Sequence, residues 1–249
     1  MKQSEQVSCG HNLSLFSKSA SYYDAIYDAA GKDYRSESKR LLQLIRRHKK
    51  SKGKSLLDVA CGTGRHISYL KASFDVEGLD VERELLAIAR KRNVGVEFHK
   101  GSMLTFKLPK RFDVITCLFS AIGYMTTVAM LRRAVRNMTL HLKPGGVLLV
   151  EPWITQRNFR NRSLHAVFVN EPKLKIARID RSFARGRTSI LDFHYLIATP
   201  RATQSFRERE EFGLFTHSEY LASFRSSGLR VVYYNKGLIG RGLYVGMKR

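Results

Sequence analysis

The sequence is poor in cysteine and in acidic residues, and it has no long apolar run. Its three cysteines, Cys9, Cys61 and Cys117, show neither metal-site nor redox spacing, so nothing predicts a metal centre or a disulfide framework. No stretch approaches the roughly 20 apolar residues that a transmembrane helix needs, and no signal peptide is recognisable. We therefore expect a cytoplasmic protein in a reducing environment, with no membrane partner.

The shortage of acidic residues gives the chain a strong positive charge. Only 21 Asp and Glu oppose 44 Lys and Arg, and the formal net charge is +23. Much of the excess lies in residues 35–54 and 157–209. A field of this sign attracts polyanions. One interpretation is a solvated basic surface. The other is an anionic partner, either a nucleotide diphosphate or RNA.

The most informative stretch, residues 56–64, reads Leu-Leu-Asp-Val-Ala-Cys-Gly-Thr-Gly. It predicts an apolar strand over 55–60, a turn at Gly62 and Gly64, and a helix over 65–72. Glycine permits positive φ and lets a ligand approach the main chain closely. The first turn of the following helix offers backbone N–H groups without helical partners. The pattern therefore predicts a ligand site at the turn.

An acidic residue follows at the distance expected for a nucleotide-type ligand. Asp80 ends the next apolar strand, over 74–79, where a carboxylate binds ribose hydroxyls in a doubly wound sheet. The third glycine of the dinucleotide fingerprint is missing. Asp58 also lies inside the first strand, where a hydride-transfer fold favours an apolar residue. A dehydrogenase is therefore disfavoured.

Strands and helices alternate through most of the first 150 residues, which predicts an α/β fold with a doubly wound parallel sheet. The expected helices are 20–30, a second one capped by Asp33, 82–92 and 126–141. The further expected strands are 94–99, 112–118 and 147–150, with a turn over 143–146.

The pattern changes after residue 153. Residues 164–215 alternate as strands do, and we expect an antiparallel β insertion over about 153–215. A helix over 217–227, capped by Thr216, and strands over 229–234 and 243–247 complete the chain. We expect residues 18–249 to form a single domain and residues 1–17 to be mobile.

The glycine turn and its surroundings resemble class I S-adenosylmethionine (SAM) dependent methyltransferases. The sequence Asp-x-Ala-Cys-Gly-Thr-Gly over 58–64 resembles their first motif, and Gly78-Leu79-Asp80 their acidic motif. Residues 112–115 and 142–146 resemble the fourth-strand motif and the loop before the fifth strand. The resemblance implies a seven-stranded Rossmann-like sheet and SAM as the cofactor.

A narrower resemblance covers most of the chain. Its segments are 31–34 (Gly-Lys-Asp-Tyr), 119–124 (Phe-Ser-Ala-Ile-Gly-Tyr), 151–153 (Glu-Pro-Trp) and 240–243 (Gly-Arg-Gly-Leu). They resemble the dTDP-aminosugar N,N-dimethyltransferases of macrolide deoxysugar biosynthesis, the desosamine and mycaminose type. In that family the insertion helps to enclose an anionic sugar nucleotide beside the SAM methyl group. The resemblance implies methyl transfer to an amine of a small molecule, with a nucleotide-linked aminosugar as the candidate substrate.

The resemblance also implies which residues contact the cofactor. They are Tyr34, Asp58, Ala60, Gly62, Gly64, Asp80, Ser102, Met103 and Phe119. One position departs from the pattern, because class I enzymes commonly have an acid where Ser102 stands. A serine offers a hydrogen bond but no carboxylate, which predicts weaker cofactor binding.

Methyl transfer from SAM requires mainly that a nucleophile be held in line with the methyl group, about 3 Å away. Tyr27 and Tyr124 are the predicted catalytic, positioning residues. Trp153 and Arg241 are the predicted substrate contacts, since a guanidinium matches phosphate oxygens two at a time. His194 and His217 are alternative bases, although no base is obligatory.

Two other functions stay open from the sequence. An RNA methyltransferase would explain the basic stretches, but the chain has no recognisable RNA-binding module and no Asn-Pro-Pro-Tyr motif. A SAM-binding protein without turnover would explain Ser102. The sequence leaves the oligomeric state open.

Overall fold

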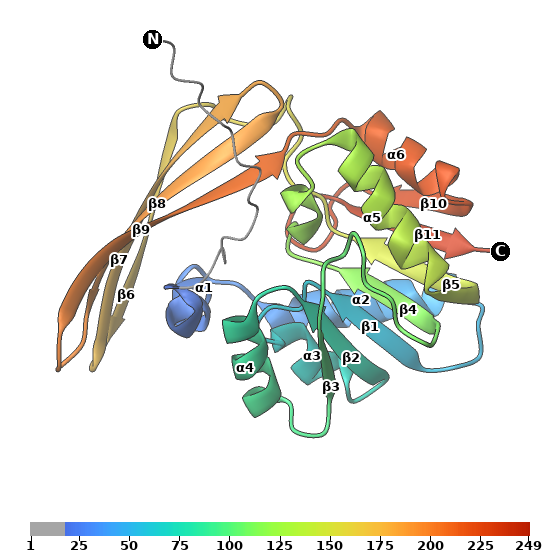
Figure 1. The fold of residues 1–249 in the computed structure, drawn as a ribbon, viewed down its shortest axis with the longest axis horizontal. Helices are drawn as coiled ribbons and strands as arrows, with labels where there is room; N and C mark the ends of the chain where they lie inside the picture. The colour runs from blue at the N-terminus through green and yellow to red at the C-terminus, as the bar shows by residue number, and fades with distance from the viewer. Residues whose placement is uncertain (1–17) are drawn as a thin grey trace, which may run out of the picture.

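The computed structural model describes residues 18–249, which form a doubly wound α/β sheet with a second, antiparallel sheet beside it (Figure 1). The segment expected to be mobile, residues 1–17, lies outside the described residues. The predicted fold class is confirmed, with seven strands in the main sheet and four in the other. None of the helices in the described part has the length and apolar content to cross a membrane.

The main sheet has the strand order β10-β11-β5-β4-β1-β2-β3. Its strands are β1 (Ser55–Val59), β2 (Asp75–Asp80), β3 (Glu97–Lys100), β4 (Phe112–Cys117), β5 (Leu142–Val150), β10 (Leu229–Tyr234) and β11 (Leu243–Lys248). Strands β1 to β5 are parallel to one another, and β11 is antiparallel to both of its neighbours, β10 and β5. The strand order reverses between β1 and β4. Doubly wound sheets bind ligands in the crevice outside the carboxyl ends of such strands.

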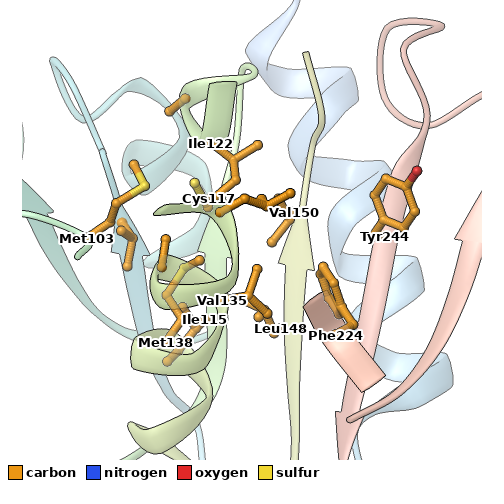
Figure 2. Packing of buried hydrophobic residues seen from close by; sticks show 14 of the residues in the cluster. Met103, Ile115, Cys117, Ile122, Val135, Met138, Leu148, Val150, Phe224 and Tyr244 are labelled. Atoms are coloured by element: carbon orange, nitrogen blue, oxygen red, sulfur yellow. The ribbon is translucent and has the colours of Figure 1, made fainter. Parts of the chain in front are cut away.

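Helices cover both faces of this sheet, because its central strands are apolar on both sides. The helical elements are η1 (Ala20–Tyr22), α1 (Tyr23–Ala29), α2 (Tyr34–His48), α3 (Arg65–Leu70), α4 (Arg83–Arg92), η2 (Ala121–Tyr124), α5 (Val128–Leu140) and α6 (His217–Ser226). Side chains of α2, α3 and α4 pack against Leu56 and Val114 on one face. Those of α5 and α6 pack against Leu57 and Ile115 on the other. Figure 2 shows this second face, with Ile115, Val135, Met138, Leu148 and Phe224.

The insertion is a four-stranded antiparallel meander between β5 and α6. Its strands are β6 (Ser163–Glu171), β7 (Leu174–Arg185), β8 (Thr188–Ala198) and β9 (Thr203–Gly213). One face belongs to an apolar cluster that includes Ile26 of α1, Trp153 and Phe212. Helix α1 lies between the two sheets in Figure 1. The N-terminal helix therefore completes the apolar packing of the insertion.

Two strands begin three or more residues away from their expected start. Residues 143–146, predicted as a turn, lie within β5, which has a register shift against the start of β4. Gly145 has a φ of +73°, so this segment is an irregular part of the strand, and its carbonyl oxygen accepts the N–H groups of Lys50 and Ser51 in the loop after α2. Strand β3 begins at Glu97 rather than at residue 94, because Gly95 has a φ of +82°.

Candidate active site

The predicted strand, glycine turn and helix form the centre of the site. Ala60, Gly62 and Gly64 all have positive φ, of 58°, 55° and 72°. A side chain at Gly64 would meet the Asn93 amide nitrogen at 2.7 Å, whereas a Cβ at Gly62 would meet nothing within 4 Å. Gly64 is therefore required for the packing of α3 against α4, and Gly62 leaves open space beside the main chain.

Asp80 connects this turn to the start of α4. Its Oδ2 accepts a hydrogen bond from the Gly62 N–H (2.8 Å), and its Oδ1 accepts one from the Glu82 N–H (2.9 Å). Burial raises the pKa of Asp80 to about 6. A carboxylate has about four acceptor positions, so capacity remains to accept a hydrogen bond from a ligand. Asp80 therefore holds the turn that precedes α4 and also has the capacity to bind ribose hydroxyls.

A single cavity of about 900 Å³ extends from this turn to the insertion sheet. It brings together ten of the predicted site residues, which are Tyr27, Ala60, Gly62, Asp80, Ser102, Met103, Phe119, Tyr124, Trp153 and Arg241. The opposite wall comes from β6 to β9 of the insertion, including Arg178 and Glu210. The turn and the insertion thus face the same space.

Three predicted cofactor residues lie behind the cavity wall. Asp58 is buried in β1 and accepts a hydrogen bond from the Thr116 hydroxyl (2.7 Å). Tyr34 is buried at the start of α2 and contacts the His66 ring edge to face. Gly64 packs against α4, as described above. In this arrangement these residues support the wall, and a direct role for each in cofactor binding stays a prediction.

The loop after β3 carries Ser102, the predicted departure from the acidic pattern. The Ser102 hydroxyl oxygen accepts the Leu104 N–H (3.2 Å). This bond caps the local turn and leaves the hydroxyl hydrogen available to a ligand. Met103 beside it is almost completely buried. Its side chain gives this end of the cavity an apolar surface.

The loop after β4 has an unusual backbone. Phe119 and Ser120 have φ values of 50° and 62°, a conformation that costs about 1–3 kcal/mol for each residue other than glycine. The Phe119 N–H donates to the buried Glu151 carboxylate (2.6 Å), and the Ser120 hydroxyl donates to the Pro152 carbonyl (2.7 Å). These bonds hold the strained loop. As a result the Phe119 ring lies edge to face with Tyr27, at 4.8 Å between centroids.

The two predicted substrate contacts pack against each other. The Arg241 guanidinium lies over the Trp153 ring, 4.8 Å from its centroid, and donates to the Ser120 hydroxyl oxygen (3.0 Å). Burial lowers the pKa of Arg241. The Trp153 indole N–H donates to the Ser189 hydroxyl of β8 (2.9 Å). These contacts hold the Arg241 guanidinium in a largely buried position, where an anionic ligand would compensate its desolvated charge.

The two predicted positioning tyrosines, Tyr27 and Tyr124, both line the cavity. Burial raises the pKa of Tyr27 to about 12 and that of Tyr124 well above its usual value. Both hydroxyls are therefore protonated at neutral pH. The Tyr124 hydroxyl donates to the Glu210 carboxylate (3.1 Å).

Comparison with known proteins identifies the family. Residues 56–146 match the model of a methyltransferase domain. The chain is 40% identical to dTDP-3-amino-3,6-dideoxy-alpha-D-glucopyranose N,N-dimethyltransferase of Streptomyces fradiae, over 92% of this chain and 90% of that one. The chain belongs to the dTDP-aminosugar N,N-dimethyltransferase family of class I SAM-dependent methyltransferases. It is a SAM-dependent methyltransferase, which confirms the predicted enzyme class and cofactor.

Solved structures agree with this assignment to the methyltransferase family. DesVI of Streptomyces venezuelae superposes with a TM-score of 0.88 at 36% identity, covering 92% of this chain and 98% of that chain. SAM-bound CalS10, an amino pentose methyltransferase from Micromonospora echinaspora, gives a TM-score of 0.83 at 37% identity, with coverages of 92% and 97%. Both likenesses include the insertion as well as the main sheet.

The residues of this methyltransferase fit SAM. Gly62 leaves space beside the main chain, Asp80 has free acceptor positions for the ribose, and Met103 offers an apolar contact. The fit rests on the shape and chemistry of the described residues. The individual contacts stay predictions.

Sequence reasoning missed the polar residues of the insertion wall in this methyltransferase. Glu210 is 5% exposed and Arg178 is 9% exposed, and both line the cavity. A signal was present in strand alternation, which places Glu210 on the same face as Phe212 and Phe206. The alternative bases lie elsewhere: the exposed His194 faces Asp192, and His217 contacts the Tyr244 hydroxyl (2.8 Å).

Proposed function

We propose that the enzyme transfers methyl groups from SAM to the amino group of a nucleotide-linked aminosugar. The observation that carries this proposal is the single cavity, with Gly62 and Asp80 at one end and basic and acidic insertion residues at the other. When bound, SAM supplies an electrophilic methyl group, whose bond to sulfur breaks as the amine nitrogen forms its new bond. The chain therefore has to orient the amine and exclude water.

The size of the cavity is compatible with SAM and a small substrate together. Its volume of about 900 Å³ lies near the upper end of the range of roughly 300–1,000 Å³ for sites that hold one drug-sized molecule. The antiparallel insertion and α1 form much of the wall opposite the glycine turn. This arrangement suits a cofactor with a second small molecule better than it suits a folded RNA.

The charges on the wall support an anionic substrate that also carries an amine. Arg160, Arg178 and Arg241 come from three separate segments and line the cavity. Guanidinium groups match diphosphate oxygens in geometry and charge. The carboxylate of Glu210 lies in the same wall, and its charge is complementary to an ammonium group.

The position of the amine on the sugar is not decided by similarity. The Streptomyces fradiae relative is named for a 3-amino sugar and is 40% identical. A relative from Saccharopolyspora spinosa is named for a 4-amino sugar and is 39% identical over the same share of this chain, 92%. A substrate panel must therefore include both positions.

The test is release of S-adenosylhomocysteine in the presence of a substrate panel. The panel contains dTDP-3-amino and dTDP-4-amino sugars, their hydroxyl analogues without the amine, and an RNA. We expect release with at least one aminosugar nucleotide and none with its hydroxyl analogue. Release with RNA alone would reject the proposal in favour of an RNA methyltransferase. SAM binding without release from any aminosugar nucleotide would favour a binding protein.

The basic surface gives RNA little further support. The Lys and Arg side chains of residues 35–54 do not line the cavity, and most of those on α2 are exposed. A salt series distinguishes charge from recognition, because attraction by charge alone falls steeply with salt and shows no sequence preference.

A further inference from the structure

Glu210 is a buried carboxylate at the reacting end of the cavity. It projects from β9 of the insertion, and its Oε2 accepts the Tyr124 hydroxyl at 3.1 Å. Tyr124 belongs to η2, directly after the strained loop that carries Phe119. Tyr27 of α1 contacts the Phe119 ring edge to face. Glu210 therefore lies beside the tyrosines that surround the predicted position of the amine.

The groups around Glu210 shift the pKa of its carboxyl in both directions. Arg178 on β7 and the Tyr124 hydroxyl favour the charged carboxylate. Glu208, on β9 like Glu210, and Asp180 on β7 favour the protonated form. The hydroxyls of Tyr23 and Tyr27 on α1, of Tyr124 on η2 and of Tyr195 on β8 also face it. Burial is the largest effect, and it raises the pKa of Glu210 to about 7. A base whose pKa is near the working pH is well matched to proton transfer.

The chemistry of the proposed reaction requires such an acceptor. An aminosugar nitrogen arrives largely as an ammonium ion and must lose one proton before its lone pair can attack. After the first transfer the nitrogen carries a methyl group, a positive charge and protons, and it must lose another proton before a second attack. Each methyl transfer thus passes one proton to the protein or to solvent.

We propose that the Glu210 carboxylate binds the substrate ammonium and accepts the proton that the amine loses before each methyl transfer. This inference rests on the proposed function. The N–H bond breaks, its electron pair stays on nitrogen as the attacking lone pair, and an O–H bond forms on Glu210. Glu210 then returns the proton to solvent. Tyr124 holds the carboxylate in place and lowers its proton affinity through the hydrogen bond that it donates.

The test compares Glu210→Gln with wild-type enzyme over a pH series on the best aminosugar nucleotide. Glu211→Gln is the matched control, since Glu211 lies next on β9 and pairs with Arg185 at 3.5 Å outside the cavity wall. We expect kcat/KM at pH 7 to fall about a hundredfold in Glu210→Gln, the low end for loss of an acid–base group. In wild-type enzyme kcat/KM should fall below pH 7. In Glu210→Gln this fall should occur instead near the pKa of the substrate amine. SAM affinity measured by calorimetry should change less than about twofold, because the group acts on the amine.

A second variant tests the inference even if Glu210→Gln fails to fold. Tyr124→Phe removes the hydrogen bond but keeps the carboxylate, and it should move the acid limb of kcat/KM to higher pH. A Glu210→Gln enzyme that binds SAM and keeps the wild-type kcat/KM and pH profile would overturn the inference. So would an unmoved acid limb in Tyr124→Phe. Failure of the proposed function is distinct, because wild-type enzyme would then release no S-adenosylhomocysteine with any aminosugar nucleotide.

Discussion

The glycine turn and the insertion wall form two halves of one cavity in different ways. The turn half uses backbone groups and one carboxylate, all within the stretch from β1 to β2. The insertion half uses side chains from distant segments, such as Arg178 on β7, Glu210 on β9 and Arg241 before β11. We propose that the first half holds SAM, a cofactor common to many enzymes. The second half is where this chain can select its substrate.

The largest expected effect is loss of SAM binding in Gly62→Val. The positive φ of 55° at Gly62 strains a β-branched residue, and the new side chain occupies the open space beside the main chain. We expect the SAM dissociation constant to rise by about a hundredfold or more, from strain and lost contact together. Calorimetric titration with SAM measures this.

The matched control for backbone strain is Gly186→Val. Gly186 lies in the hairpin between β7 and β8, has a φ of 59° and also has nothing within 4 Å of an added Cβ. It should lower the melting temperature but leave SAM affinity intact. Equal SAM affinity in Gly62→Val and wild-type enzyme would show that the turn is not the cofactor site.

Asp80→Ala should weaken SAM binding less than Gly62→Val. Loss of charge-assisted hydrogen bonds costs roughly 1.5–3 kcal/mol, which is about ten- to a hundredfold in affinity. The melting temperature should also fall, because the bonds to the Gly62 and Glu82 N–H groups are lost. Asp80→Asn keeps one acceptor and should lose less of both. Asp75→Ala, at the exposed start of β2, is the control. An intact SAM affinity in Asp80→Ala would leave only the structural role.

Arg241→Ala tests the insertion half without touching the turn. It removes a guanidinium that stacks on Trp153 and contacts Ser120. We expect KM for the aminosugar nucleotide to rise about tenfold, as one lost charge-assisted contact gives, while SAM affinity changes little. Arg241→Lys should recover only part of the loss, since an ammonium lacks the planar fork. A rise in the SAM dissociation constant with unchanged KM would instead place Arg241 in the cofactor half.

The smallest expected effect is on stability as a function of pH. Folding raises the pKa of Glu210 from 4.5 to about 7, so its contribution to the unfolding free energy is lost as pH rises between these values. Glu210→Gln does not titrate and should not show this loss. The melting temperature of wild-type protein relative to the variant should therefore fall as pH rises over that window. A constant difference across the window would contradict the buried-carboxylate assignment.

The sequence predicted the geometry of the glycine turn, but it did not predict the polar residues that the insertion contributes to the cavity, for physical reasons. Gly62 and Asp80 are close in sequence, and the strands that carry them pair directly, so spacing alone places them together. Glu210 meets Tyr124 only because η2, α1 and the insertion pack around one cavity. Strand alternation indicates that Glu210 lies on the same face of its strand as Phe212, but it does not indicate which element lies opposite. Likewise, nothing local indicated that residues 143–146 would continue β5.

The most direct measurement is a crystal structure of the complex with S-adenosylhomocysteine and a dTDP-aminosugar. We expect the cofactor ribose against Asp80, the diphosphate beside the arginines of the insertion half, and the sugar nitrogen within hydrogen-bonding distance of Glu210 or Tyr124. A nucleotide sugar bound outside the shared cavity, or a ribose with no contact to Asp80, would contradict the division of the site into these two halves.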